Sequence, residues 1–312
     1  MVCRIRLEGK IAATGVVRVL VFLAFAAFSA PAVSALSEEP RELALLTWTP
    51  EKPSQGQVVH FRVRPADGWA VTGMSFQSRP LRFFTLEDGN AEWHALCGVD
   101  AQLEPGQYEF QVQTMDQAGH PGVVGVAKLE VLPGNFAQEH LKLPASMVDL
   151  SRKNLERVRR ERARVESLWP VETPELLWKG PFLTPVEGGS GSPFGVRRWI
   201  NGQPRSPHTG QDISAPEGSP VRAANSGKVA FVADHFFEGK SVFLDHGGGL
   251  YTMYFHLSRI CVREGDMVPR GDVLGWVGST GRATGPHLHW GVRLGGARVD
   301  PQSLLERTGE FR

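Results

Sequence analysis

The amino-acid sequence predicts a mainly β protein with an N-terminal immunoglobulin-like β-sandwich, a linker helix and a C-terminal domain again built of β-sheet. Short runs of alternating apolar and polar residues, separated by turn residues, predict the first domain. One stretch with apolar residues three and four positions apart predicts the helix. Strand-like runs between glycine-rich turns, without the strand–helix alternation of parallel sheets, predict the last domain. A chain of 312 residues exceeds a typical single domain, which agrees with this division.

Residues 1–35 have the organisation of a secretory signal peptide. Basic residues precede the apolar run 19–28, and small residues ending in Val33-Ser34-Ala35 follow it. The run is short for a membrane span, and an uncleaved N-terminal anchor is the alternative. Either interpretation predicts an exported protein of the periplasm or cell envelope, so we leave these residues out of the predicted fold.

Residues 36–135 form the predicted β-sandwich. Alternating runs occur at residues 58–63, 108–113 and 127–131, and turn signals separate them. Short strands at this spacing are typical of an immunoglobulin-like sandwich. The domain contains no cluster of catalytic residue types, so we expect it to have a binding or regulatory role.

Residues 146–180 contain the predicted basic helix and a proline-rich linker. Apolar residues recur at helical spacing within residues 148–168, and Ser151 is a candidate N-cap. Residues 152–164 hold seven basic and two acidic side chains. Such a face is solvated in one interpretation and makes a weak contact with an anionic envelope surface in the other. The prolines that follow predict a stiff connector: Pro170, Pro174, Pro181 and Pro185.

Residues 181–312 are predicted to form the second β domain, and three histidine motifs lie within it. Its strands are expected at 227–233, 241–244, 250–256, 273–277 and 287–293. The motifs are His208-Thr-Gly-Gln-Asp212, Tyr254-Phe-His256 and His287-Leu-His289. Together they supply four imidazoles and one carboxylate.

These motifs contain the residue types of a catalytic zinc site, which keeps three protein ligands and holds water in the fourth position. The metal lowers the pKa of that water to about 7, which makes a hydroxide nucleophile available at neutral pH. His287 and His289 are two residues apart on a predicted strand and point to one face. Gly210 and the flanking prolines place His208 and Asp212 on a loop that enters a strand. Spacing alone does not say which member of the His-x-His pair reaches the metal.

At these residues the sequence resembles the LytM/lysostaphin-type zinc metallopeptidases, a family of peptidoglycan endopeptidases. The likeness covers about residues 180–305 and extends to further short motifs: Phe194-Gly195-x-Arg197, Ala215-Pro216-x-Gly218, Gly227-x-Val229, Asp245-His246-Gly247, Val268-x-x-Gly271 and Gly278-x-Thr280-Gly281. The resemblance implies an antiparallel sheet whose cleft carries Zn2+. It also implies the metal ligands His208, Asp212 and His289, and the catalytic, non-ligand residues His256 and His287. No position of this signature is missing, unlike in degenerate members that lack zinc and activate separate amidases.

The sequence therefore predicts an exported zinc-dependent endopeptidase that hydrolyses peptide bonds in peptidoglycan stems or cross-bridges. A zinc-activated water is the expected nucleophile. One of His256 and His287 is expected as general base and acid and the other as oxyanion stabiliser, and the sequence does not assign the two roles. Tyr254, expected on the strand face of His256, either offers a hydroxyl to the substrate or packs against the wall of the site. Arg197 is expected to bind a substrate carboxylate, with a solvated loop arginine as the alternative.

Two other functions stay open from the sequence. The first is a non-catalytic cell-wall-binding protein or amidase activator, which the complete motif set argues against, and the second is a zinc hydrolase of another exported peptide. The 34 basic and 33 acidic residues give no electrostatic case for nucleic-acid binding. Cys97 and Cys261 are expected as separate thiols, with a disulfide in an oxidising compartment as the alternative. The oligomeric state is unknown from the sequence.

Overall fold

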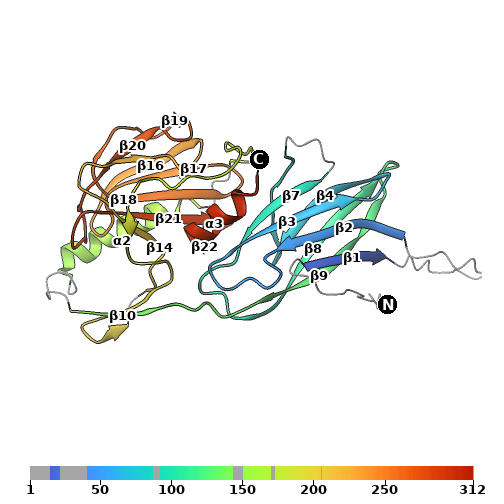
Figure 1. The fold of residues 1–312 in the computed structure, drawn as a ribbon, viewed down its shortest axis with the longest axis horizontal. Coiled ribbons are helices and arrows are strands. Elements are labelled where there is room, and N and C mark those ends of the chain that lie inside the picture. The colour runs from blue at the N-terminus through green and yellow to red at the C-terminus, as the bar shows by residue number, and fades with distance from the viewer. Residues whose placement is uncertain are drawn as a thin grey trace, which may run out of the picture. The chain divides into compact units, whose positions relative to one another are not determined.

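The computed structural model describes residues 15–21, 41–86, 92–142, 150–169, 173–204 and 206–311. This part of the chain consists mainly of β-strands and has two helices, α2 (Arg152–Glu166) and α3 (Pro301–Thr308) (Figure 1). The mainly β class predicted from the sequence is confirmed. Apart from strand β1 (Gly15–Val21), the predicted signal peptide lies outside the described residues. No helix in the described ranges is long and apolar enough to cross a membrane.

The chain divides into two compact units. Unit 1 consists of Met1–Pro53, Val59–Cys97 and Gly106–Val131, and unit 2 of Ser54–Val58, Gly98–Pro105 and Leu132–Arg312. Most of the predicted β-sandwich lies in unit 1. Two short stretches of it belong to unit 2, together with the predicted helix and the predicted zinc domain. The first half of the chain therefore also contributes residues to the second unit.

Unit 1 contains a five-stranded sheet of order β1-β2-β3-β7-β6 and a four-stranded sheet of order β5-β4-β8-β9. The strands after β1 are β2 (Arg41–Thr49), β3 (Val58–Pro65), β4 (Trp69–Phe76), β5 (Arg79–Pro80), β6 (Phe83–Phe84), β7 (Trp93–Gly98), β8 (Gly106–Asp116) and β9 (Pro121–Val131). The ring of Phe110 on β8 lies 5.2 Å from that of Trp48 on β2 and 5.0 Å from that of Phe61 on β3. All three side chains are buried, so these contacts between the two sheets form the core of the unit.

Unit 2 is organised around a ten-stranded sheet in which every strand pair is antiparallel. Its main path is β11-β14-β21-β18-β17-β16-β19, and β15, β20 and β22 pair off this path. The strands are β11 (Gly189–Ser190), β14 (Gly210–Ser214), β15 (Pro220–Arg222), β16 (Gly227–His235), β17 (Gly239–Asp245), β18 (Leu250–Ile260), β19 (Met267–Val268), β20 (Val273–Val277), β21 (His287–Leu294) and β22 (Ala297–Val299). The five strands predicted in this region are confirmed as β16, β17, β18, β20 and β21, and so is the antiparallel sheet.

The core of unit 2 is formed by one face of β18 and β21. Leu288 and Trp290 of β21 are fully buried in it, as are Tyr254 and Leu257 of β18. Because side chains alternate along a strand, the histidines on either side of Leu288 point to the opposite face. The apolar residues of the His-x-His motif thus hold the strand, and its histidines are left for the site.

A second sheet of unit 2 has three strands, β10 (Gln138–Leu141), β12 (Arg197–Ile200) and β13 (Gln203–Pro204). Strand β10 pairs in parallel with β12, with Glu139 opposite Arg198. The sequence did not predict β10, which brings the segment that follows unit 1 in the chain beside the strand before the first histidine motif.

Helix α2 begins after Ser151, whose hydroxyl accepts a hydrogen bond from the Asn154 N–H. This confirms the predicted N-cap. Three ion pairs at i,i+4 stabilise the helix: Arg152–Glu156, Arg157–Glu161 and Arg162–Glu166. The helix also contacts the connection between β16 and β17, where the Glu161 carboxylate accepts from the Phe236 N–H.

The segment after α2, predicted as a stiff connector, packs against the sheet of unit 2. Trp178 and Phe182 are buried there. The side-chain amide of Asn225 donates to the carbonyls of Lys179, Gly180 and Pro181 over 3.2 to 3.4 Å. Burial of the two aromatic rings between the prolines explains why this stretch is part of the unit rather than a spacer.

Candidate metal centre

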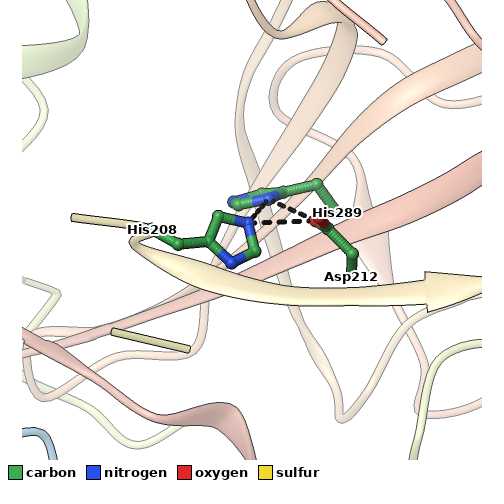
Figure 2. Close-up of side chains that lie close together, drawn as sticks. All are labelled: His208, Asp212 and His289. Atoms are coloured by element: carbon green, nitrogen blue, oxygen red, sulfur yellow. Dashed lines mark hydrogen bonds and ion pairs between the residues drawn. The ribbon is translucent and has the colours of Figure 1, made fainter. Parts of the chain in front are cut away.

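Three of the sequence-predicted site residues converge on one point. Strand β14 pairs with β21 so that Asp212 lies directly opposite His289, and His208 lies just before β14. The Nε2 of His208 is 2.9 Å from the Nδ1 of His289. The Oδ1 of Asp212 is 3.0 Å from the first of these nitrogens and 2.9 Å from the second, as the dashed lines of Figure 2 show.

Gly210 allows the chain to pass close beneath these side chains. A Cβ at this position would lie 2.5 Å from the Trp290 carbonyl oxygen and 2.6 Å from the Nε2 of His289. Both distances are far below a normal contact, so a residue with a side chain would displace β14 or the imidazole. The glycine that the sequence indicates as a loop signal is thus required by the close approach of the two strands.

A backbone carbonyl fixes the orientation of His208. Its Nδ1 lies 2.8 Å from the carbonyl oxygen of Pro193. Since a carbonyl can only accept, Nδ1 carries the proton, and the lone pair on Nε2 is directed at Asp212 and His289. Such an outer partner is the usual support of a metal-binding imidazole.

The donor set suits a zinc ion. Nε2 of His208, Nδ1 of His289 and Oδ1 of Asp212 lie within 4.8 Å of one another. The proton of a neutral His208 is on Nδ1, so among these three atoms only the Nδ1 of His289 could carry a proton. A cation stabilises such a group of electron-rich atoms. Two imidazoles and a carboxylate are also the ligand types of catalytic zinc sites, which keep three protein ligands. The residues present therefore fit the metal that the sequence predicts.

The charge states of the cluster agree with metal binding. Burial alone would raise the pKa of Asp212, but its hydrogen bonds with His208 and His289 outweigh burial and hold that pKa well below its ordinary value. Burial lowers the pKa of His289, although the hydrogen bond with Asp212 opposes the shift. The carboxylate is thus ionised and the imidazole neutral, as metal ligands must be.

The two remaining motif histidines border this cluster. The rings of His256 and His287 lie 4.7 Å apart, and the Nε2 of His287 is 3.9 Å from the Oδ1 of Asp212. The Nδ1 of His256 donates to the Thr280 carbonyl and that of His287 to the Gly285 carbonyl, each over 2.8 Å. Both imidazoles therefore carry their proton on Nδ1, which leaves Nε2 free of a proton when they are neutral. Burial, followed by the neighbouring His289, lowers the pKa of His256 to about 4, so this imidazole is neutral at pH 7.

Comparison with known proteins assigns the family. A model of Peptidase family M23 matches residues 206–301, which include all five residues described above. A crystal structure described as a peptidase M23 from Pseudomonas aeruginosa is 33% identical, with a TM-score of 0.63, and the match covers 83% of this chain and 96% of that one. This chain belongs to peptidase family M23.

Curated relatives of the M23 peptidase match it over a shorter range. The DD-carboxypeptidase/endopeptidase Mpg of Neisseria meningitidis is 44% identical over 120 residues, which are 38% of this chain and 28% of that protein. The peptidoglycan DD-endopeptidase ShyA of Vibrio cholerae is 41% identical over 95 residues, 30% of this chain and 22% of that protein. The match thus spans less than a third of the length of either relative.

Tyr254 does not lie at the candidate metal centre of this M23 peptidase. Its side chain is fully buried, and its hydroxyl accepts from the Ala224 N–H at 2.9 Å and lies 2.8 Å from the Thr252 hydroxyl. The structure thus places this hydroxyl in the core of unit 2 and away from the metal centre, which favours the packing alternative. The reason is the backbone of His256, whose φ of 63° interrupts the alternation of β18, so that the two side chains do not share a face. Phe255 stacks on His289 instead, with ring centroids 5.2 Å apart.

Arg198, and not Arg197, reaches the cluster of this M23 peptidase. Arg197 is exposed, and its backbone N–H donates to the Ala137 carbonyl. The guanidinium of Arg198 lies 3.6 Å from the Oδ2 of Asp212. Arg198 is not among the site residues predicted from the sequence. Neighbouring residues of a strand point to opposite faces, so only one of Arg197 and Arg198 can face the site. The sequence does not indicate which of the two it is.

Proposed function

We propose that this M23 peptidase is an exported zinc endopeptidase that hydrolyses peptide bonds in peptidoglycan stems or cross-bridges. The observation that carries the proposal is the convergence of His208, Asp212 and His289, with His256 and His287 beside them. The relatives named as peptidoglycan DD-endopeptidases support the substrate class. An amidase activator or wall-binding protein would not need this complete set of proton-accepting groups.

In this proposal, His208, Asp212 and His289 would hold the zinc ion. When bound, zinc supplies Lewis acidity and lowers the pKa of water at the site. The remaining steps fall to the side chains around it, and the hydrogen bonds of the two non-ligand histidines allow their roles to be proposed.

His256 is the proposed general base. It is neutral at pH 7, because burial lowers its pKa to about 4, and its Nε2 is free to accept a proton. The Thr280 carbonyl holds the opposite nitrogen, so the ring keeps its orientation and its new charge is stabilised when Nε2 is protonated. The same proton can then pass to the leaving amine.

His287 is the proposed stabiliser of the developing oxyanion. An imidazole whose Nδ1–H is held by a carbonyl can donate to an oxyanion only from a protonated Nε2. The Nε2 of His287 lies 3.9 Å from the Oδ1 of Asp212, so it borders the candidate metal position where the carbonyl oxygen of a substrate would lie. The two histidines therefore share one type of backbone support and are proposed to have different roles.

The test is hydrolysis of purified sacculi by the full chain, followed by mass spectrometry of the released fragments. We expect cleaved stem or cross-bridge peptides with the wild type, none with His208→Ala, and wild-type activity with His120→Ala, which removes an exposed histidine of unit 1. Intact sacculi after treatment with the wild type and with His120→Ala would contradict the proposal. Cleavage of soluble peptides together with intact sacculi would favour the hydrolase of another exported peptide.

Export and the roles of the other segments are part of the proposal. Residues 1–35 are proposed to direct the chain to the periplasm or cell envelope, and N-terminal sequencing of the mature protein distinguishes a cleaved signal peptide from an anchor. The sandwich of residues 36–135 is proposed as an immunoglobulin-like binding or regulatory domain. On α2, exposed Lys153, Arg159 and Arg160 lie outside the three arginine–glutamate pairs and are the proposed weak contact with an anionic envelope surface.

A further inference from the structure

The two oxygens of Asp212 have different surroundings. Oδ1 faces the nitrogens of His208 and His289, at 3.0 and 2.9 Å. Oδ2 faces the guanidinium of Arg198, at 3.6 Å. The carboxylate therefore presents one oxygen to the candidate metal position and the other to an arginine.

Arg198 is itself held by residues from two other segments. Its Nε donates to the Oε2 of Glu139 at 2.9 Å, and its Nη2 donates to the Oγ of Ser192 at 2.9 Å. Glu139 belongs to strand β10, which pairs in parallel with β12 and places the two residues opposite each other. A planar guanidinium with two of its three nitrogens engaged has little freedom to turn away from Asp212.

The segment that carries Glu139 is fixed by packing. The ring of Phe136, just before β10, lies 6.2 Å from that of Phe194. It also occupies the space above Gly195, where a Cβ would lie 2.1 Å from it. The Gly134 N–H donates to the side chain of Gln55 at 3.0 Å. The position of Glu139 is therefore determined by contacts on the same unit that carries the metal centre.

We infer that Glu139 and Arg198 are positioning residues for Asp212, through which strand β10 sets the zinc affinity of the centre. The inference rests on the zinc site of the proposed function. Outer partners that orient a metal ligand typically change metal affinity by about 10- to 100-fold when they are removed. Glu139 and Arg198 both lie outside residues 206–301, which carry the family match.

The charges explain why the arginine needs its glutamate. A guanidinium beside the metal position repels a divalent cation and opposes the benefit of orienting Asp212. The carboxylate of Glu139, 2.9 Å from Nε, offsets that positive charge. The pair thus acts as a nearly neutral support, and loss of Glu139 alone leaves the arginine held by Ser192, with its charge no longer offset by Glu139.

The experiment measures the dissociation constant of Zn2+ for the full chain by competition with a chromophoric chelator. The variants are Arg198→Ala, Glu139→Gln and the double variant. Arg307→Ala is the matched control, since Arg307 pairs with Glu310 at 3.1 Å elsewhere in unit 2. We expect about 10- to 100-fold weaker binding for Arg198→Ala and a smaller loss for Glu139→Gln, with no change in the urea midpoint of the metal-free protein. The double variant should bind no more weakly than Arg198→Ala, because both residues act through one contact.

Wild-type affinity in both single variants would overturn the inference, and so would additive losses in the double variant. If Arg198→Ala does not fold, Glu139→Gln decides the question, because this isosteric change affects a side chain that is 38% exposed. A wild-type chain that binds no Zn2+ would overturn the proposed function and this inference together. If the wild type binds Zn2+ and the variants bind it equally well, the inference is overturned while the proposed function stands.

Discussion

Gly210 lies between two proposed metal ligands at a place where a side chain has no room. We expect Gly210→Ala to lower the free energy of unfolding by about 1–3 kcal/mol, as overpacking of a tight site does. Zinc affinity should fall as well, because the added Cβ would meet the imidazole of His289. Gly189→Ala is the matched control, since its Cβ would have no neighbour within 4 Å. Urea unfolding of the two variants with equal midpoints would contradict this account.

His246 makes the stability of unit 2 depend on pH. It is fully buried, with Nδ1 2.7 Å from the Ser226 carbonyl oxygen and Nε2 2.7 Å from the Thr252 hydroxyl. Burial lowers its pKa from 6.5 to about 4, although the hydrogen bond with Ser226 opposes the shift. The unfolded chain therefore binds the proton more tightly. The contribution of neutral His246 to the free energy of unfolding is complete above pH 6.5. It is lost as the pH falls towards 4, by up to about 3 kcal/mol.

Urea midpoints measured from pH 7.5 to 4.5 check this expectation. The wild type should become less stable as the pH falls, and His246→Asn should show a shallower decrease. Equal slopes for the two proteins would show that His246 is not responsible.

Tyr254 shows where residue-scale prediction stops. Tyr254 and His256 are two residues apart on a predicted strand, so regular alternation would place both side chains on one face. The left-handed φ of His256 interrupts this alternation, and the His256 N–H donates to the carbonyl of Glu238 in the connection between β16 and β17, a contact that the sequence of β18 does not indicate. The five motif residues were predictable because their chemistry and local spacing define them.

Among the secondary-structure elements, helix α2 supports the end of β16 and the connection between β16 and β17. Glu161 accepts from the Phe236 N–H at 3.0 Å, and Arg157 donates to the Asp234 carbonyl at 2.8 Å. The same connection holds His256 through the carbonyl of Glu238. We expect Glu161→Ala to reduce stability by about 1–2 kcal/mol and to lower the turnover rate without loss of zinc.

Glu156→Ala is the matched control for the helix. Glu156 pairs with Arg152, which is 95% exposed, so its loss should change stability by less than about 0.5 kcal/mol. Thermal unfolding and sacculus turnover compare the two variants. Equal effects would show that α2 does not steady the connection.

The elements differ in how well the sequence predicts them. The strands β16, β17, β18, β20 and β21 are runs of strand-forming residues between glycine-rich turns, so their pattern is local and could be recognised in the sequence. Strand β10 has four residues and exists through its parallel pairing with β12, about sixty residues later. No local pattern of Gln138–Leu141 indicates that partner, and the support of Asp212 by Glu139 was therefore missed.

At the scale of the whole molecule, unit 2 depends on residues far from the histidine motifs. Asp100 accepts from the Arg298 guanidinium at 2.8 Å, and the Val58 N–H donates to the Ser303 hydroxyl at 2.9 Å. A fragment of residues 180–312 keeps all five motif residues but loses these contacts and strand β10. We expect it to melt at a lower temperature and to bind zinc more weakly than the full chain.

A fragment of residues 132–312 separates the two effects. It regains β10 and should recover zinc affinity, while its melting temperature should stay below that of the full chain. Circular dichroism and chelator competition measure both. A 180–312 fragment as stable and as tightly zinc-binding as the full chain would show that the motif region is self-sufficient.

In the proposed mechanism three of the five motif residues hold zinc, while His256 transfers protons and His287 stabilises the oxyanion. The most direct test of this mechanism is the zinc content of each purified single alanine variant, measured beside its rate of sacculus hydrolysis. The account predicts loss of both zinc and activity for the variants of His208, Asp212 and His289. It predicts near-stoichiometric zinc with at least about 100-fold lower activity for those of His256 and His287. Full zinc in a ligand variant, or full activity in His256→Ala, would contradict it.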